Sequence, residues 1–401
     1  MAQYTSKELM EMEHHYGAHN YHPLEVVISK AEGIWVEDPE GKRYMDMLSA
    51  YSAVNQGHRH PRIIQALKDQ ADVLTLTSRA FFNDRWPLFA KKLAEVTGKE
   101  MILPMNTGAE AVETAIKTMR KWGYLVKGVE QDKAEIIVFE ENFHGRTVTI
   151  VSFSVDPDAK DNYGPYTPGF VVVPYDDLDA VEKAVNKNTV GILVEPIQGE
   201  AGVRVPTGGF LNGLEAIARE HNLLLAMDEV QTGFCRTGKT FAFQHEGINP
   251  DIIIMGKALG GGVLPVSAIA ADKEVLGVFK PGTHGSTFGG NPLACSVAMA
   301  AIDVLVDEKL ADRAAELGAY FMEGLRAIKS PKIKEVRGKG LLIGVVLNES
   351  AGKARIYTTA LKDRGLLCKE THSWIIRFAP PLVITREEVD AALKIIAEVL
   401  A

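Results

Sequence analysis

Residues 223–257 read LLLAMDEVQTGFCRTGKTFAFQHEGINPDIIIMGK, and our prediction of the fold starts from this stretch. It contains two apolar runs, Leu223–Met227 and Ile252–Met255, without alternating polar positions. Continuous hydrophobicity over so few residues is typical of strands buried on both faces, as in a parallel sheet covered by helices. Asp228 directly follows the first run and Lys257 follows the second. Ligands of such sheets bind beyond the carboxyl ends of the strands, so both residues are candidates for chemistry.

The sequence on either side continues this pattern. Two stretches with helical spacing of apolar residues, Ala109–Trp122 and Gly213–Glu220, alternate with further short apolar runs. These runs are Ile136–Phe139, Val171–Val173, Ile192–Val194 and Val266–Ala270. We therefore predict an α/β architecture, with a mostly parallel mixed sheet flanked by helices.

The pattern of apolar and polar residues changes after about residue 290. Helical patterns are followed by apolar runs and by a final amphipathic helix, Arg386–Leu400, for which Thr385 is the expected N-cap. The patterns and runs are Leu293–Val306, Ala311–Ile328, Leu341–Leu347 and Ile375–Phe378. This predicts a smaller α+β domain. We expect a large domain over 51–287, a small domain over 288–401, and an N-terminal segment, 1–50, that packs with the small domain.

Composition narrows the classes of function. The chain has 401 residues, 46% hydrophobic and 24% charged, with 44 basic and 52 acidic residues interspersed. That balance argues against a nucleic-acid surface. The cysteines, Cys235, Cys295 and Cys368, are odd in number and far apart, which favours neither a disulfide framework nor a zinc site, and we expect no metal. No stretch reaches the ~20 apolar residues of a membrane span, and no targeting segment is evident, so we expect a cytoplasmic protein.

Two motifs resemble nucleotide-binding sequences. Gly233–Thr240 matches G-x-x-x-x-G-K-[ST], the phosphate loop of nucleotide hydrolases, but Gly247 and Pro250 interrupt the helix that should follow it. Gly338–Gly344 is one residue too long for a dinucleotide fingerprint and precedes a strand. A nucleotide hydrolase that uses Gly233–Thr240 is the alternative from a different class of function.

A set of three elements favours a different site. Asn106–Ala111 is a turn of mostly small residues that opens a helix, where backbone N–H groups bind phosphate. Asp228 at a strand end suits a cationic partner such as a pyridinium N–H, and Lys257 in a glycine-rich turn suits an amine nucleophile. Each also fits an ordinary role: an N-cap at Thr107, a turn-capping aspartate and a solvated lysine. Their occurrence together in one α/β domain favours chemistry.

These residues belong to a longer pattern. Residues 225–238, LAMDEVQTGFCRTG, followed by KALGGG from Lys257, resemble the signature of the class III aminotransferases. The resemblance extends over almost the entire chain and includes residues 106–108 and 285–292. It implies the fold type I of the transferases that depend on pyridoxal 5′-phosphate (PLP), and it accounts for the phosphate-loop match as part of the signature.

The resemblance also implies roles for the cofactor-binding residues. Lys257 would carry PLP as a Schiff base and later move the substrate proton, and Asp228 would keep the pyridine nitrogen protonated. Gln231 would hydrogen-bond the ring hydroxyl, and Phe143 would stack on the ring. Gly108 and Ala109 would bind the phosphate within the chain. Ser286 and Thr287 would bind the phosphate of the neighbouring subunit in a homodimer with shared active sites. His144, where an aromatic residue is frequent, would alter the stacking.

Within the class, segments at residues 17–24, 51–58, 142–147, 195–202 and 377–384 resemble the ornithine aminotransferases. This implies transfer of the δ-amino group of L-ornithine to 2-oxoglutarate by a ping-pong mechanism, giving glutamate-5-semialdehyde and glutamate, within arginine and proline metabolism. The implied substrate-binding residues are Tyr21, Tyr51, Arg146, Glu200 and Arg377. Acetylornithine, 4-aminobutyrate and lysine aminotransferases are the rivals within the class, and Tyr21 with Tyr51 favours ornithine.

Overall fold

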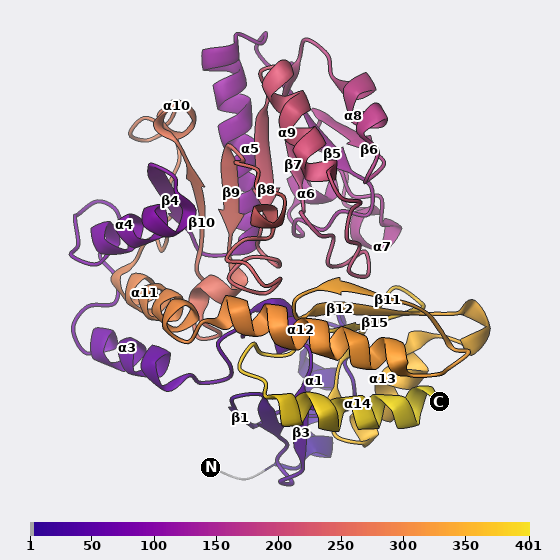
Figure 1. Cartoon of the computed structure of the whole chain (residues 1–401). Helices are drawn as coiled ribbons and strands as arrows, with labels where there is room; N and C mark the ends of the chain where they lie inside the picture. Colours follow the sequence, from indigo (N-terminus) through magenta and orange to yellow (C-terminus); the bar gives the residue numbers. More distant parts are fainter. Residues whose placement is uncertain (1–3) are drawn as a thin grey trace.

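A computed structural model describes residues 4–401 and contains three sheets (Figure 1). The central sheet has seven strands in the order β4-β10-β9-β8-β7-β5-β6. Only β10 runs antiparallel to the other strands of this sheet. Their bounds are Met101–Met105 (β4), Glu135–Phe139 (β5), Phe170–Val173 (β6), Thr189–Val194 (β7), Leu224–Asp228 (β8), Ile252–Met255 (β9) and Ser267–Ala271 (β10). The predicted mostly parallel mixed sheet is therefore confirmed.

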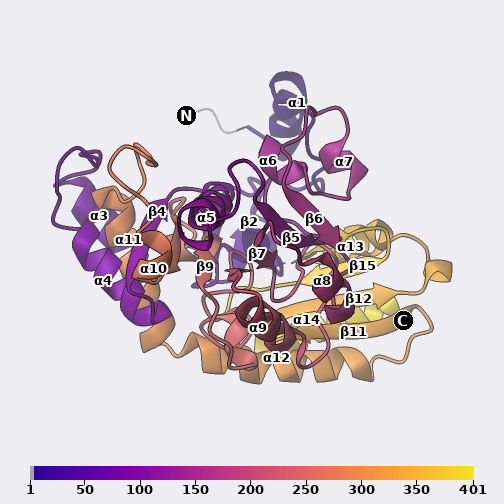
Figure 2. The same cartoon turned by 90° about the horizontal axis from the view of Figure 1, so that it is seen from above.

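Both faces of the central sheet are covered by helices, which explains the continuous apolar runs. On β9, Ile252 and Ile254 pack in the hydrophobic cluster beneath helix α5 (Gly108–Trp122), whereas Ile253 and Met255 belong to the larger cluster on the opposite face. The second face is covered by α8 (Leu178–Ala184) and α9 (Phe210–Glu220), as the view from above shows (Figure 2).

The sequence pattern did not predict strand β4. Its sequence, MILPM, contains Pro104, and its outer residues are less buried than those of the central strands. Because proline has no N–H to donate, a proline within an apolar run argues against a central strand. β4 avoids this conflict by lying at the edge of the sheet, paired only with β10.

The remaining chain forms two four-stranded sheets below the central one in Figure 1. The first has the order β11-β12-β15-β14 and is antiparallel; in the second, β1-β2-β3-β13, the N-terminal β3 pairs in parallel with β13 of the C-terminal region. Their bounds are Ile333–Lys339, Leu342–Leu347, Ile375–Phe378 and Lys369–Thr371 for the first, and Lys30–Glu32, Trp35–Glu37, Arg43–Asp46 and Leu366–Leu367 for the second.

Helix α12 (Leu310–Ala327) packs against β11 and against α14 (Arg386–Leu400), whose N-cap is Thr385 as predicted. Other α-helices are Ser6–Tyr16 (α1), Ser49–Ser52 (α2), Pro61–Ala71 (α3), Trp86–Thr97 (α4), Val148–Val151 (α6), Pro157–Lys160 (α7), Lys273–Leu276 (α10), Pro292–Asp307 (α11) and Ala354–Asp363 (α13). Short 3-10 and π segments lie at Gly123–Lys127, Ala242–His245, Lys257–Gly260 and Glu349–Ala351. Among residues 4–401, no helix is both long and apolar enough to cross a membrane. The domain boundaries at 50 and 287 remain a prediction.

The interpretation of Gly233–Thr240 as a phosphate loop is wrong. A phosphate loop leads directly from a strand into a helix whose N-terminus binds the phosphate. Here Thr240 is followed only by the short 3-10 turn Ala242–His245. The segment instead follows β8 through a series of turns.

Candidate active site

A cavity of about 180 Å³ lies where β8 and β9 end and α5 begins. Six of the residues predicted from the sequence line it together: Gly108, Ala109, Phe143, Asp228, Gln231 and Lys257. The parallel sheet explains the meeting, because the carboxyl ends of neighbouring strands reach the same edge.

Lys257 enters the cavity from a strained turn. Gly256 is extended, and Lys257 itself has φ of 44°, in the left-handed region that lysine rarely adopts. Burial lowers the pKa of the Lys257 amine, an effect that Glu200 and Asp228 oppose and Arg377 reinforces. A lowered pKa increases the fraction of the neutral, nucleophilic amine at neutral pH.

Asp228 is held by a histidine. His144 Nδ1 lies 2.6 Å from Asp228 Oδ2, both residues are buried, and the N–H of Val230 donates to Asp228 Oδ1 at 3.0 Å. Burial alone would lower the pKa of His144, but the hydrogen bond and charge of Asp228 outweigh it and raise that pKa. Our expectation that His144 would act on stacking did not include this hydrogen bond, because the two residues are 84 positions apart and no local pattern joins them.

The first turn of α5 contains the two residues that we predict bind the phosphate. Thr107 and Glu110 form a capping box, so Thr107 Oγ1 accepts from the N–H of Glu110. The N–H groups of Gly108 and Ala109 have no hydrogen-bond partner among residues 4–401 and lie at the positive end of the helix dipole. A Cβ on Gly108 would lie 2.9 Å from Val230 Cγ1, so a larger residue would displace this wall of the cavity.

Glu195 is a site residue to which the sequence reasoning assigned no role. It lines the cavity and accepts a hydrogen bond at 3.0 Å from the N–H of Phe143, which fixes the backbone beneath the predicted stacking ring. Burial raises the pKa of Glu195 to about 7, although the neighbouring His144 opposes the shift. Its position directly after the apolar strand β7 was the signal available in the sequence.

Three polar side chains meet beside the cavity. Arg377 Nη1 donates to Glu200 Oε1 at 2.6 Å and to Gln231 Oε1 at 3.2 Å, and Gln231 Nε2 donates to Glu200 Oε1 at 3.1 Å. Arg377 is buried, and its Nε and Nη2 have no partner in the described part of the chain. Burial would raise the pKa of Glu200, but Arg377 lowers it. The structure thus joins the two predicted charges and leaves one edge of the guanidinium free.

Tyr51 completes this group from an unusual turn. All four residues of Ser49–Ser52, labelled α2, have positive φ, between 47° and 69°, so this segment is a left-handed turn and not a right-handed helix. The Asp46 carboxylate accepts from the N–H of Ser49 at 3.0 Å. The turn places the ring of Tyr51 4.9 Å from the guanidinium carbon of Arg377. Burial, with the charge of Glu200, raises the pKa of the Tyr51 hydroxyl.

The other predicted residues do not line this cavity. Tyr21 is 69% exposed, and Arg146 is exposed with its guanidinium carbon 5.6 Å from the ring of Phe143. Ser286 Oγ accepts from Asn106 Nδ2 at 2.9 Å, beside the start of α5, and Thr287 is exposed. These four side chains lie at the rim or outside it within this single chain.

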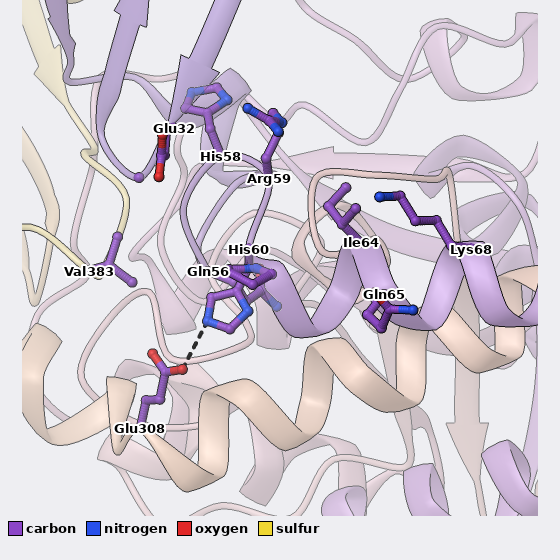
Figure 3. A pocket seen from close by; sticks show the side chains of 12 residues that line it. Glu32, Gln56, His58, Arg59, His60, Ile64, Gln65, Lys68, Glu308 and Val383 are labelled. Carbon is purple, nitrogen blue, oxygen red and sulfur yellow. Dashed lines mark hydrogen bonds and ion pairs between the residues drawn. The ribbon is translucent and has the colours of Figure 1, made fainter.

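A larger cavity, about 490 Å³, has none of the predicted site residues in its lining (Figure 3). His60 Nε2 lies 2.9 Å from Glu308 Oε1 there, whereas His58 Nε2 contacts Asp46 Oδ2 at 2.8 Å. His58 and His60 therefore contact different carboxylates. Among residues 4–401, no group of three or more His, Cys, Asp or Glu side chains could hold a metal ion.

The chain is similar to known proteins over nearly its whole length. Residues 16–400 match the family described as Aminotransferase class-III. The chain belongs to the class III aminotransferases. Similar class members include the ornithine aminotransferase of Brevibacillus brevis, 62% identical over 392 residues and 98% of both chains. The structure of the ornithine aminotransferase from Toxoplasma gondii, with partial occupancy of PLP at its active site, has a TM-score of 0.98 at 47% identity, over 100% of this chain and 95% of that one. The acetylornithine aminotransferase from Elizabethkingia anophelis has a TM-score of 0.90 at 49% identity and 99% coverage of both.

As a class III aminotransferase, the protein uses PLP, and its side chains fit that cofactor. The buried Asp228 offers an acceptor for a pyridinium N–H, and the free N–H groups at the start of α5 suit a phosphate. Lys257 has no hydrogen-bond or ion-pair partner among the described residues, as expected of an amine that forms a covalent link. PLP, once bound, supplies an electron sink for the amino-transfer chemistry.

Proposed function

We propose that the enzyme is an L-ornithine:2-oxo-acid 5-aminotransferase. It moves the δ-amino group of L-ornithine to 2-oxoglutarate in two half-reactions, and releases glutamate-5-semialdehyde, which cyclises to pyrroline-5-carboxylate, and then glutamate. The observation that carries this proposal is the Glu200–Arg377 pair at 2.6 Å, which gives one site two charge states. Identities of about 60% to ornithine aminotransferases over nearly the whole chain support it.

The residues divide the work between the two substrates. In the ornithine half-reaction, Glu200 neutralises Arg377, so the carboxylate of ornithine is not drawn to that arginine. Arg146 at the rim takes the carboxylate with its planar fork, and Tyr21 holds the α-amine. Only the δ-amine then reaches the cavity. There Lys257 would move the proton of the carbon that bears this amine.

2-Oxoglutarate needs a second carboxylate site close to the cavity. Arg377 provides it when Glu200 withdraws, and its Nε and Nη2 are already free of other partners in the described structure. The ring of Tyr51 lies against one face of the Arg377 guanidinium, where it excludes water and holds the guanidinium in its orientation. The hydrogen bond with His144 keeps the Asp228 side chain in place through both half-reactions.

We further propose that the enzyme works as a homodimer in the cytoplasm. Exposed aromatic side chains support an interface. Phe288, next to Thr287, is 55% exposed, and Phe82 is fully exposed four residues before Trp86, which packs beside Gly290. In such a dimer, Ser286 and Thr287 would reach the phosphate of the neighbouring subunit. The three cysteines are free and buried, as is usual for proteins of a reducing compartment.

The test is the visible spectrum of the purified holoenzyme, recorded before and after L-ornithine is added without an oxo acid. We expect the band of the lysine-bound cofactor to disappear while pyrroline-5-carboxylate accumulates in a single turnover. N-acetylornithine and 4-aminobutyrate serve as comparison amines and should leave the band unchanged. A band that ignores ornithine and bleaches with either comparison amine would contradict the substrate assignment and keep the class.

A further inference from the structure

Arg236 is an arginine that the amino-transfer chemistry does not use, yet it is completely buried. Its Nη1 donates to the carbonyl oxygens of Leu341 at 2.9 Å and Pro380 at 2.6 Å, and its Nη2 donates to Asn55 Oδ1 at 2.5 Å. No carboxylate forms an ion pair with it within residues 4–401. The guanidinium therefore joins three segments that are distant in the sequence through neutral acceptors alone.

A buried cation without a counter-ion is unfavourable, and only strong hydrogen bonding sustains it. Burial lowers the pKa of Arg236 to about 9, while Asp46 acts in the opposite direction. Arginine suits this position better than lysine because its donors radiate from a rigid plane and reach separate acceptors at once. The ammonium of lysine is a single point and could not span the same three segments.

Two of the three joined segments, those of Asn55 and Pro380, and the segment of Arg236 itself each carry a side chain of the substrate group. Asn55 lies four residues after Tyr51, Pro380 lies three residues after Arg377, and Arg236 itself lies five residues after Gln231. Arg236 thus lies where the segments that position Tyr51, Arg377 and Gln231 meet.

Further hydrogen bonds tie the same segments together. Asn55 Nδ2 donates to the carbonyl oxygen of Phe234 at 2.8 Å, and the N–H of Leu382 donates to the carbonyl oxygen of Asn55 at 2.8 Å. Ser49 Oγ, in the turn that presents Tyr51, donates to the carbonyl oxygen of Ala379 at 2.7 Å. A change at Arg236 should therefore be felt at the substrate group.

The segments that meet at Arg236 include the two glycine-containing motifs that resemble nucleotide-binding sequences. The N–H of Leu341 donates to the carbonyl oxygen of Arg236 at 3.1 Å, opposite to the side-chain bond between these residues. Gly340 has φ of 56°, and a Cβ there would lie 2.4 Å from the carbonyl carbon of Thr237. Gly340 permits this close approach of the two backbones, which brings Leu341 to Arg236.

We propose that Arg236 is a positioning residue for substrate recognition, which fixes Tyr51 and Arg377 relative to Gln231. The proposal deepens the proposed function and rests on it, since it assigns the spacing of the two-substrate site to a residue behind that site. Of the predicted cofactor-binding residues, only Gln231 lies on the segment of Arg236, whereas Lys257 and the N–H groups of Gly108 and Ala109 lie elsewhere, at the end of β9 and the start of α5. A change at Arg236 should therefore act on substrate recognition and leave the lysine and the phosphate site in place.

The test compares R236M and R236K with a matched control, R313M. Arg313 on α12 also donates to backbone carbonyls, those of Val383 and Ile384, and is partly buried. It contacts the far end of the segment that follows Arg377, but it does not bridge that segment to those of Tyr51 and Gln231. We expect both Arg236 variants to raise the KM for 2-oxoglutarate at least about tenfold and to weaken the preference for the δ-amine. Their PLP dissociation constant and cofactor band should stay as in the wild type. R313M should lower Tm without a change in KM.

A purely structural role for Arg236 predicts a different outcome, in which R236M lowers Tm to the same degree as R313M and keeps the wild-type KM. That result would overturn the proposal. If R236M does not fold, R236K decides: it keeps the charge but not the three-way span, so an unchanged KM in R236K is equally contrary. Failure of the proposed function would appear separately, as a wild-type enzyme whose cofactor band ignores L-ornithine.

Discussion

The two sides of the active site are built differently. The cofactor side consists of strand ends and a helix start within one sheet, so Asp228 and Lys257 meet because β8 and β9 are neighbours. The substrate side, by contrast, is assembled from Tyr51, Glu200 and Arg377, on segments separated by more than a hundred residues. The cofactor side therefore depends on regular structure, and the substrate side depends on a few side-chain contacts that hold irregular segments together.

The largest expected effect is on the cofactor side. Lys257→Ala removes the amine that we propose holds PLP and moves the proton, so we expect transamination to fall by about 10⁴-fold. The matched control is Lys127→Met, which removes another lysine whose pKa is lowered by burial, but one that donates only to the carbonyl oxygens of Thr189 and His221. Steady-state rates and the cofactor spectrum measure both. Retention of the band in Lys257→Ala would contradict its role.

The next effect separates the two sides. Glu200→Gln leaves Arg377 without its anionic partner, so the α-carboxylate of ornithine can bind there and bring the α-amine to Lys257. We expect the ratio of α- to δ-transfer to rise about 10- to 100-fold, equivalent to about 1.4 to 2.7 kcal/mol, with an unchanged PLP dissociation constant. Product analysis by mass spectrometry measures the ratio. Glu141→Gln, which breaks an exposed pair with Arg204 at 3.2 Å, is the control. An unaltered ratio in Glu200→Gln would refute the charge switch.

The sequence was more informative about the cofactor side for the same physical reason. Apolar runs that end in Asp228 and Lys257 have a local signature, and the helix start after Asn106 does too. The contacts of Arg377 with Glu200 and Gln231, and those of Arg236, depend on the approach of distant segments, which no local pattern encodes. Family resemblance supplied the identities of the substrate residues, but not the turn of positive φ at Tyr51 or the free edge of Arg377.

A smaller effect concerns the hydrogen bond between His144 and Asp228 in the apoprotein. Because the folded pKa of His144 is raised, its contribution to stability is complete below about pH 6.5, the unfolded value, and is lost as pH rises through the folded pKa. We expect His144→Phe to reduce the free energy of unfolding by about 1 to 3 kcal/mol at pH 6 and by less at pH 9. Urea unfolding at both pH values measures this.

His245→Phe is the control for that experiment, because burial lowers the pKa of His245 and reverses the sign. The stabilising contribution of the neutral His245 is present above pH 6.5 and is lost as pH falls through the folded value. The difference between wild type and His245→Phe should therefore grow with pH, opposite to that of His144→Phe. The same trend in both variants would show that the His144–Asp228 contact does not govern the response.

The smallest effect tests whether regular structure alone forms the phosphate site. Thr107→Ala removes the capping box at the start of α5, and Thr385→Ala removes the equivalent box at the start of α14. Each should lower the free energy of unfolding by about 1 kcal/mol. Only Thr107→Ala should also weaken PLP binding, by a few-fold, because the cap orients the free N–H groups of Gly108 and Ala109 toward the cavity. Equal PLP dissociation constants in the two variants would mean that the sheet edge, and not the cap, orients the phosphate site.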